Sequence, residues 1–246
     1  MKVIAIYNIK GGVGKTATAV NLSYLASLDG ISTLIWDLDP QAAASFYFKI
    51  KAKVKGGGRK LIEGKFDPDD AIRGTDYENL DLLPADFSYR NMDIFLEQIK
   101  NPVKRLHKLL KPFSKEYDII FLDCPPSISS ASESVFAATD ILLVPTIPTT
   151  LSLQTFQQIQ KFFSKQDYAP IKVLPFFVMV DRRKQMHRLI VDKPPAFMSN
   201  VLQSNVPYAS EIERMGIHRA PVGAFAQRSK AARCYLELWQ EIRSAI

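Results

Sequence analysis

A glycine-rich segment near the beginning of the chain places the strongest constraint on its fold. Residues 10–16 read Lys-Gly-Gly-Val-Gly-Lys-Thr and follow the apolar run of residues 3–7. Apolar residues then recur at helical spacing, at Ala19, Leu22 and Ala26. A strand, a glycine-rich turn and a helix in this order predict a βα unit whose turn can hold an anion at the N-terminus of the helix.

The segment departs from the standard phosphate loop at one position. That pattern, Gly-x-x-x-x-Gly-Lys-Thr, requires a glycine at position 9, where this chain has Ile9. The variant instead carries an additional lysine, Lys10, in front of its glycines. Three glycines in four positions still let successive N–H groups face inward and form an anion-binding nest. We predict that the residues of this nest bind nucleotide phosphates; they are Gly11, Gly12, Val13 and Gly14.

Two side chains complete the predicted nucleotide site. Lys15 can reach the β- and γ-phosphates, and the hydroxyl of Thr16 can ligate Mg²⁺. The alternative is a flexible glycine-rich turn with lysines present by chance. Glycine makes up about 7% of residues in an average protein, so three glycines followed by Lys-Thr in this register rarely arise by chance. The strand before the segment and the helix after it also favour the nucleotide site.

Composition excludes several classes of protein. The chain has 246 residues, 47% of them hydrophobic, but no apolar run approaches the roughly 20 residues that span a bilayer. We expect no cleaved signal peptide because residues 1–9 lead directly into the glycine-rich segment. Its two cysteines, Cys124 and Cys234, predict neither a disulfide framework nor a structural zinc site, and a cytoplasmic setting fits best. The net charge of +7 favours a polyanionic partner, which ATP or DNA would satisfy.

Apolar runs alternate with longer amphipathic segments along the chain. This order predicts an α/β fold with a mostly parallel, twisted sheet flanked by helices on both faces. We expect a single domain over residues 1–246. The predicted strands are near-continuous apolar runs at residues 2–7, 33–37, 80–84, 118–123, 140–145 and 172–180. Gly30 is expected to end the first helix, and residues 236–242 have the apolar spacing of a helix packed on the sheet.

Two aspartates follow the second predicted strand. Asp37 and Asp39 are two residues apart, so both side chains can lie on one face at the carboxyl end of that strand. Ligands bind at this edge of open α/β sheets. Two carboxylates beside Mg²⁺ and a triphosphate can hold metal-bound waters and position the attacking one. Alternatively, the two aspartates are ordinary polar residues at the point where the strand passes into a loop. The phosphate loop earlier in the chain disfavours this alternative.

A third aspartate ends the fourth predicted strand. Asp123 follows four apolar residues and precedes Cys-Pro-Pro-Ser at residues 124–127. In a phosphate-loop NTPase, a carboxylate in this place binds Mg²⁺, usually through water. The two prolines restrict the backbone beyond it, which suits a segment that senses the γ-phosphate.

Residues 49–60 are rich in lysine and glycine. Lys51, Lys53, Lys55, Arg59 and Lys60 surround three consecutive glycines. We expect a mobile loop, for which a contact with nucleic acid is an alternative role. The three histidines, His107, His187 and His218, have neither metal-ligand nor catalytic-triad spacing, so we expect surface positions, with His218 in a loop.

Residues 10–16, 37–41 and 123–127 together resemble the ParA/MinD family of deviant-Walker ATPases. The resemblance runs along nearly the whole chain. Residues 78–85, 179–183 and 228–236, with Pro207, resemble ParA more than MinD. Because the first predicted strand begins at residue 2, we do not expect the N-terminal helix-turn-helix of the larger ParA type, nor sequence-specific operator binding.

The resemblance implies a mechanism. Two ATP-bound monomers would form a sandwich dimer in which Lys10 reaches the phosphates of the partner, as an arginine finger does in trans. Lys15, Thr16 and the backbone of Ala17 would bind the protein's own nucleotide, and Asp39 would orient the attacking water. Thr16, Asp37 and Asp123 would form the Mg²⁺ site. Met179 and Pro207 would lie near the nucleotide base.

The family also implies macromolecular partners. ParA proteins of this kind bind nucleoid DNA non-specifically as ATP dimers in the bacterial cytoplasm, and a ParB-like partner releases them by stimulating slow hydrolysis. They segregate plasmids, chromosomes or other large cargo. From Arg182 to the C-terminus the chain has eleven basic and five acidic residues. The residues predicted to contact DNA are Arg214, Arg219, Arg228 and Lys230.

Two positions depart from the family pattern. Ala17 replaces a common threonine, which removes a hydroxyl contact to the α-phosphate while keeping the N–H. Glu211 lies where many ParA proteins carry an arginine linked to DNA binding. Three alternatives remain. The first is a MinD-like membrane ATPase, which needs a basic amphipathic tail, and the second is an electron carrier, which needs cysteines that hold an iron–sulfur cluster. The third is a DNA-binding protein without ATPase activity. No membrane contact is expected because residues 236–242 carry acidic charges.

Overall fold

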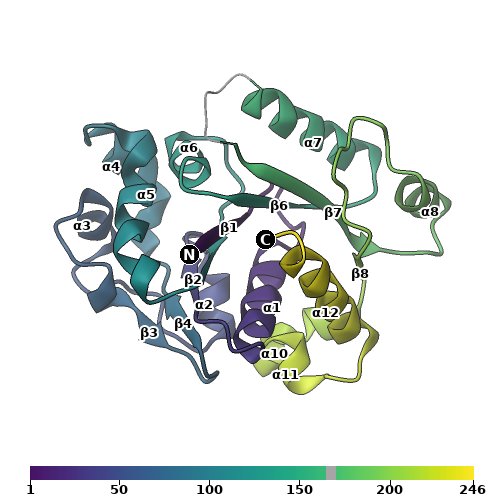
Figure 1. Ribbon diagram of the computed structural model, residues 1–246, viewed down its shortest axis with the longest axis horizontal. Coiled ribbons are helices and arrows are strands. Elements are labelled where there is room, and N and C mark those ends of the chain that lie inside the picture. Colours follow the sequence, from purple (N-terminus) through teal and green to yellow (C-terminus); the bar gives the residue numbers. More distant parts are fainter. Residues whose placement is uncertain (165–169) are drawn as a thin grey trace.

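The computed structural model describes residues 1–164 and 170–246. Its centre is one eight-stranded sheet with the order β3-β4-β2-β5-β1-β6-β7-β8 (Figure 1). All neighbouring strands are parallel except β3 and β4. The strands are β1 (Lys2–Ile6), β2 (Thr33–Asp37), β3 (Arg73–Gly74), β4 (Leu80–Leu83), β5 (Ile119–Asp123), β6 (Ile141–Thr146), β7 (Lys172–Val180) and β8 (Asn205–Pro207).

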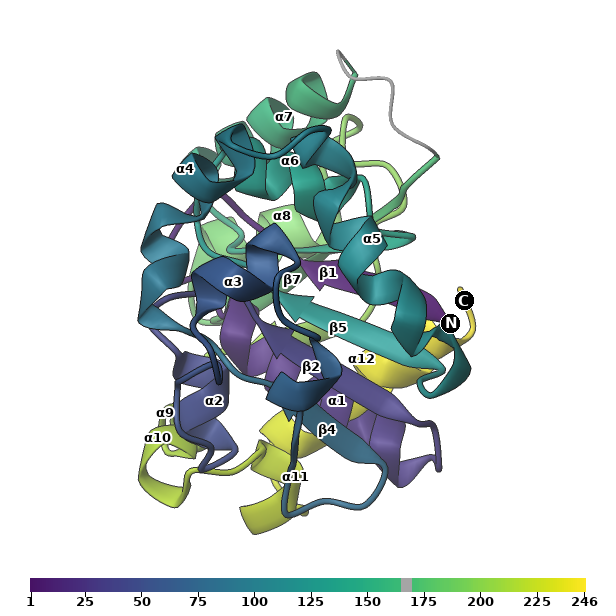
Figure 2. The same cartoon turned by 90° about the vertical axis from the view of Figure 1, so that its left-hand side faces the viewer.

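Helices cover both faces of the sheet, which confirms the predicted fold class (Figure 2). One face carries α1 (Lys15–Leu28), α2 (Ala43–Tyr47), α9 (Ser210–Glu213), α10 (Met215–His218), α11 (Val222–Phe225) and α12 (Lys230–Arg243). The other carries α3 (Gly58–Glu63), α4 (Met92–Glu97), α5 (Arg105–Leu110), α6 (Ser130–Phe136), α7 (Thr150–Phe163) and α8 (Gln185–Asp192). Short 3₁₀ turns lie at Asp69–Ala71, Phe87–Asn91, Pro102–Lys104 and Lys111–Lys115.

The central strand β1 explains why the sheet needs two layers of helices. Val3, Ala5 and Tyr7 belong to the core on the α3–α8 side, whereas Ile4 and Ile6 belong to the core on the α1–α12 side. Side chains alternate between the two faces of a strand, so a continuous apolar run requires cover on both. The closing helix α12 buries Leu238, Trp239 and Ile242 against the second core, as its apolar spacing predicts.

All six predicted strands are present, with bounds within one residue of those expected. The sequence missed β3 and β8, which have two and three residues and lack an apolar run. Gly30 follows the end of α1 with a φ of 75°, the left-handed conformation that glycine adopts easily. That prediction is confirmed.

Residues 49–60 do not form one continuous loop, so that prediction is wrong for part of the segment. Helix α3 begins at Gly58, and Val54 is fully buried while its N–H donates to the carboxylate of Asp86 at 3.0 Å. An apolar anchor and a short helix therefore hold the segment at two points. The lysines at 51, 53 and 55 are exposed.

Two histidine predictions also need correction. His187 is buried on α8, where its Nδ1 accepts a hydrogen bond from the N–H of Asp181 at 3.1 Å. His218 is exposed as expected but ends α10 and stacks on Phe225, with ring centroids 4.1 Å apart. Among the described residues, no helix is long and apolar enough to cross a membrane.

Candidate active site

The glycine-rich segment connects β1 to α1 at the carboxyl edge of the sheet. β1 lies between β5 and β6, so the loop emerges from the middle of the molecule. Gly12 and Gly14 have φ values of 71° and 79°, and a Cβ built at either position would meet no atom within 4 Å. Gly14 precedes the first turn of α1 and provides no side chain to cap it. The free N–H groups of that turn suit a phosphate.

Lys15 points into the loop. Its side chain is buried, and its Nζ donates to the carbonyl of Lys10 at 3.2 Å. Burial lowers the pKa of Lys15, while the nearby charges of Asp123 and Asp39 act in the opposite direction. The ammonium group therefore lies inside the curl of the loop, where it can donate charged hydrogen bonds to a polyphosphate.

Lys10 points in a different direction. Its N–H donates to Oδ1 of Asn8 at 2.9 Å, and Asn8 in turn donates from Nδ2 to the carbonyl of Pro145 at 2.8 Å. Its Nζ lies 3.4 Å from Oγ of Ser152, a buried residue on α7. The two lysines of the segment thus diverge, and only Lys15 faces the loop interior.

Asp37 and Asp123 end two neighbouring parallel strands and are paired in the register of β2 and β5. Both are fully buried. Oδ2 of Asp37 accepts hydrogen bonds from the N–H and the hydroxyl of Ser45, at 2.8 and 2.7 Å. Burial first, and the charge of Asp39 second, raise the pKa of Asp37 to about 6, against the hydrogen bonds from Ser45.

Asp123 is the less satisfied of the two carboxylates. Neither of its oxygens has a hydrogen-bond partner of normal geometry within the described part of the chain, although the hydroxyl of Thr16 is near enough to lower its pKa. Burial and the charge of Asp37 outweigh that effect and raise the pKa of Asp123 well above its usual value. A fully buried carboxylate without a donor, beside a hydroxyl, is a donor set that fits Mg²⁺.

Asp39 lies beyond the end of β2 and is partly exposed. Its N–H donates to Oδ1 of Asp37 at 3.3 Å, and its own Oδ1 accepts from the N–H of Gln41 at 2.9 Å. Asp37 and Asp39 are therefore neighbours, as the sequence predicts, but only Asp39 is accessible. This division suits a buried metal-side carboxylate and an exposed one that can contact water.

The segment after Asp123 is tied to the central strand. The hydroxyl of Tyr7, which directly follows β1, donates to the carbonyl of Ser127 at 2.7 Å. Its ring packs edge-on against Phe136, with centroids 4.8 Å apart, so the tyrosine is fixed. This contact joins the start of the phosphate loop to the proline-containing segment. Sequence reasoning missed Tyr7, Ser45 and Ser152, because serines and one tyrosine carry no motif.

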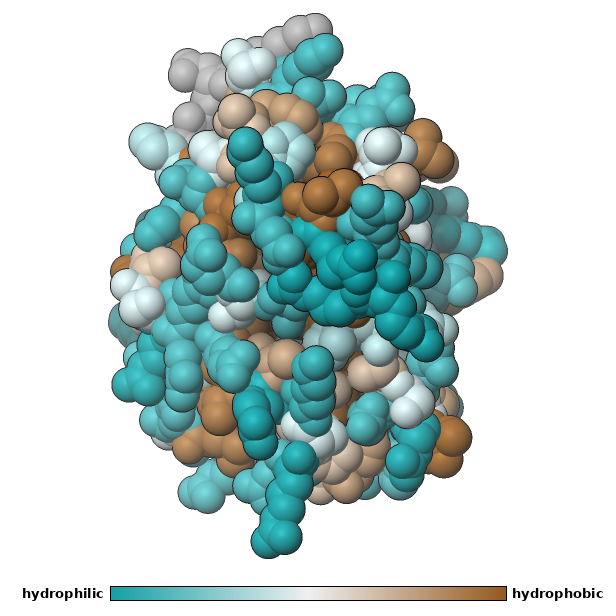
Figure 3. Space-filling view, turned by 90° about the vertical axis from the view of Figure 1, so that its right-hand side faces the viewer, coloured by the Kyte–Doolittle hydropathy of each residue, from teal (hydrophilic) through white to brown (hydrophobic). Residues whose placement is uncertain are grey.

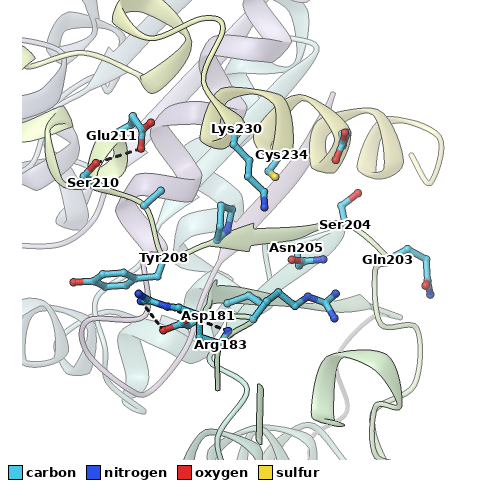
Figure 4. Close-up of a pocket in the computed structure, with 15 residues that line it drawn as sticks. Asp181, Arg183, Gln203, Ser204, Asn205, Tyr208, Ser210, Glu211, Lys230 and Cys234 are labelled. Atoms are coloured by element: carbon cyan, nitrogen blue, oxygen red, sulfur yellow. Dashed lines mark hydrogen bonds and ion pairs between the residues drawn. The ribbon is translucent and has the colours of Figure 1, made fainter. Parts of the chain in front are cut away.

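Met179 and Pro207, the residues expected near the base, lie on the adjacent strands β7 and β8. The pairing shifts between Phe177 and Val180, and Met179 has a φ of 53°, so a bulge interrupts β7 at this point. A cavity of about 860 Å³ opens beside it (Figure 4). Pro207 and Val180 line this cavity, whereas Met179 and the phosphate loop do not.

Comparison with known proteins agrees with this geometry. A family model described as an AAA domain matches residues 1–170. The sporulation initiation inhibitor protein Soj of Bacillus subtilis is 30% identical over 98% of both chains. Two solved structures are similar in fold. A putative plasmid partition protein from Borrelia burgdorferi, bound to AMPPNP, has a TM-score of 0.87 and 20% identity, and the match covers 100% of this chain and 99% of that one. MinD of Pyrococcus horikoshii with Mg-ADP has a TM-score of 0.79 and 22% identity, and the match covers 98% of this chain and 95% of that one.

The chain belongs to the ParA/MinD family of ATPases. It is an ATPase. A relative from Myxococcus xanthus, 28% identical over 98% of this chain and 87% of that protein, is named "chromosome partitioning protein ParA".

The four basic residues predicted for this ParA/MinD ATPase to contact DNA have different environments. Arg219 stacks over the ring of Phe46, 4.6 Å from its centroid, and its Nε donates to the carbonyl of the same residue at 3.0 Å. Arg214 lies 3.2 Å from the ring nitrogen of His218. Arg228 and Lys230 are exposed at the start of α12. The latter pair is therefore the more available for a polyanion.

Lys230 also lines the cavity beside β8, together with Cys234 and Glu237 of α12 (Figure 4). On the opposite wall, Arg183 forms an ion pair with Asp181 at 2.9 Å. The side of the molecule that carries α8 and β8 is mainly hydrophilic, with apolar groups in separate patches (Figure 3). Glu211, the acidic departure from the ParA pattern, lines the same cavity.

Proposed function

We propose that this chain is a single ATPase domain over residues 1–246 that dimerises with ATP and positions or segregates a large cargo on DNA. The observation that carries the proposal is the divergence of the two loop lysines. Lys15 faces the loop interior, and Lys10 extends from it to Ser152 on α7. A lysine that does not serve its own phosphate loop is suited to serve the nucleotide of a second subunit.

In this proposal each subunit binds its own nucleotide through the loop amides, Lys15 and Thr16. The Mg²⁺ site consists of Thr16 and the buried pair Asp37 and Asp123, and the ion neutralises phosphate charge when it is bound. Asp39, which is accessible, orients the attacking water. Lys10 of the second subunit stabilises the negative charge that develops at the γ-phosphate. Hydrolysis is therefore slow until the dimer has formed.

We further propose that the ATP dimer binds duplex DNA without sequence preference in the bacterial cytoplasm and nucleoid. The exposed pair Arg228 and Lys230 supports this proposal, as does the excess of basic residues from Arg182 onward. A dimer doubles the number of phosphate contacts on one face, and affinity rises steeply with that number. A ParB-like protein that stimulates hydrolysis would then release it. A membrane role has less support because α12 buries its apolar face.

DNA binding tests this function directly. Fluorescence anisotropy with unrelated duplexes would compare no nucleotide, ADP and ATP, and ATP with Asp39→Ala, over a salt series. We expect binding only with ATP, strongest with Asp39→Ala, and weaker as salt increases. The double variant Arg228→Glu/Lys230→Glu should lose binding while still dimerising with ATP.

The matched control is Lys161→Glu/Lys172→Glu, which makes the same charge change at exposed positions on α7 and β7. It should retain most of the binding. DNA binding that is indifferent to nucleotide would contradict the switch. If both double variants lose DNA binding equally, the DNA contact does not lie at α12. ATP-dependent binding to liposomes in place of DNA would favour the MinD-like role.

A further inference from the structure

A buried arginine lies outside the nucleotide site, on the face of the sheet that carries α3 and α5. Arg105 is the first residue of α5 and only 8% of its surface is exposed. Its Nε donates to the carbonyl of Ile62 near the end of α3. Its Nη2 is buried and has no hydrogen-bond partner within residues 1–164 and 170–246. Capping α3 therefore uses only part of the guanidinium.

The backbone at Gly64 is shaped around this guanidinium. Gly64 ends α3 with a φ of 70°, and a Cβ at this position would lie 1.9 Å from Nη2 and 2.9 Å from Cζ of Arg105. No other residue could therefore occupy position 64 without displacing the arginine. The planar group is held in one orientation, with an unused donor.

The guanidinium also lacks a counter-charge. Within the described chain, no carboxylate lies within ion-pair distance of Arg105, and burial alone lowers its pKa. Glu63, which follows the Ile62 that Arg105 contacts, is already bound by Arg59 at 2.6 Å and Lys65 at 2.7 Å. A buried charge without a partner is costly, so an external anion at this point would stabilise the folded state.

A cavity of about 400 Å³ adjoins the arginine between the end of α3 and α5. Arg105, Lys65 and Lys108 line it with positive charge, and Asp67 is the one acidic residue in its lining. Lys108 is exposed and forms no ion pair in the described part of the chain. The cavity thus combines a mostly buried guanidinium with two exposed lysines, of which Lys65 is paired with Glu63 and would share its charge with a bound anion.

We propose that this cavity binds a phosphate-type oxyanion, with Arg105 as the buried anchor and Lys65 and Lys108 as the outer contacts. A guanidinium presents paired donors that match two oxygens of a phosphate, and lysines add point charges. The site is separate from the phosphate loop, since no loop residue lines it. The phosphate can be a free anion or part of the backbone of DNA, and the two sources predict different results.

The first experiment uses protein saturated with Mg-ADP, so that the phosphate loop is already filled. Its thermal midpoint is followed while sodium phosphate replaces sodium chloride at constant ionic strength. For a free anion we expect saturable stabilisation. The double variant Lys65→Met/Lys108→Met should weaken phosphate affinity at least tenfold without changing the midpoint in chloride by a comparable amount, and Arg105→Gln should remove the effect.

The matched control is Lys111→Met/Lys115→Met, which removes the same charge from exposed residues of the turn that follows α5. Neither of these lysines lines the cavity. The control should bind phosphate like the wild type. If Arg105→Gln fails to fold, the two lysine double variants decide the question alone.

The second experiment measures duplex DNA binding with ATP for the same two double variants. If the phosphate belongs to DNA, the cavity variant should bind DNA at least tenfold more weakly than the control variant, and inorganic phosphate should give no saturable shift. If the anion is free, the two variants should bind DNA equally. The proposal is overturned if phosphate has no saturable effect and the two variants also bind DNA alike.

Discussion

The ammonium group of Lys10 lies 3.4 Å from the hydroxyl of Ser152 at the start of α7. Ser152 is buried and also accepts a hydrogen bond from the hydroxyl of Thr149 at 3.1 Å, so it is fixed in place. The lysine that the proposed mechanism assigns to the partner's nucleotide is therefore held by its own subunit. Dimerisation would have to exchange this contact for one with phosphate.

Substitution of Ser152 by alanine should therefore favour the ATP dimer. One hydrogen bond contributes about 1 kcal/mol net, so we expect half-maximal dimer at roughly fivefold lower ATP concentration. Size-exclusion chromatography with light scattering, over an ATP titration, measures this. Thr155→Ala on the same helix is the control, because that hydroxyl donates to the carbonyl of Leu151 one turn earlier. A requirement for more ATP would show that Ser152 supports Lys10 in its active position.

Lys15→Ala should abolish tight ATP binding. The substitution removes the buried ammonium group at the centre of the loop, and charged hydrogen bonds of this kind contribute about 1.5–3 kcal/mol each. We expect affinity to fall by roughly 100-fold in an equilibrium titration with a fluorescent ATP analogue. Lys10→Ala is the matched control and should bind ATP nearly normally as a monomer while losing dimer-dependent hydrolysis. Wild-type affinity in Lys15→Ala would refute the assigned nucleotide site.

Asp39→Ala should keep ATP binding and slow hydrolysis. Asp39 is partly exposed and contacts the backbone of Gln41, whereas Asp37 is buried, so only the former can orient a water from solvent. Loss of a positioned acid–base group typically costs about 10²–10⁴ in rate. Phosphate release should slow by at least 100-fold, and the dimer should persist longer. Normal turnover would assign the water-positioning role to another residue.

The fold was predictable where the chain follows the simplest rules. Strands buried on both faces are continuous apolar runs, and all six that the sequence predicts are present. The rule does not predict β8, because its three residues, Asn-Val-Pro, are too few to show a periodicity. This strand pairs with β7 across a bulge at Met179. The burial of Val54 was likewise not predictable, since one apolar residue among lysines gives no pattern.

The positions of the motif residues were predictable from the sequence, and the contacts that hold them in place were not. Asp37 and Asp123 were found because each ends an apolar run, and their pairing in register follows from the order of β2 and β5. Ser45 and Ser152 are common residues, and their contacts depend on tertiary structure: Ser152 lies 142 positions from Lys10. Arg105 likewise resembles any basic residue of an amphipathic helix until its burial is known.

The last prediction concerns Asp123, whose buried carboxylate has the least hydrogen bonding in the site. Asp123→Asn should stabilise the nucleotide-free protein, because it removes a buried charge without a good partner; relief of such a group is worth about 1–3 kcal/mol. The same substitution should remove the additional stabilisation that Mg²⁺ gives in the presence of ATP. Urea unfolding at pH 7.5, with and without Mg-ATP, measures both effects.

The pH dependence of the free energy of unfolding tests whether the charge of Asp123 is what destabilises the wild type. The pKa of Asp123 is raised in the folded state, so the folded protein binds a proton more readily than the unfolded chain. The wild type is therefore destabilised by this group above its folded pKa and recovers as pH falls toward the unfolded value of about 4. The stability advantage of Asp123→Asn should therefore shrink as the pH falls toward 4. The control Glu116→Gln, at an exposed position, should give no such trend, and a constant advantage for Asp123→Asn would point to packing instead of charge.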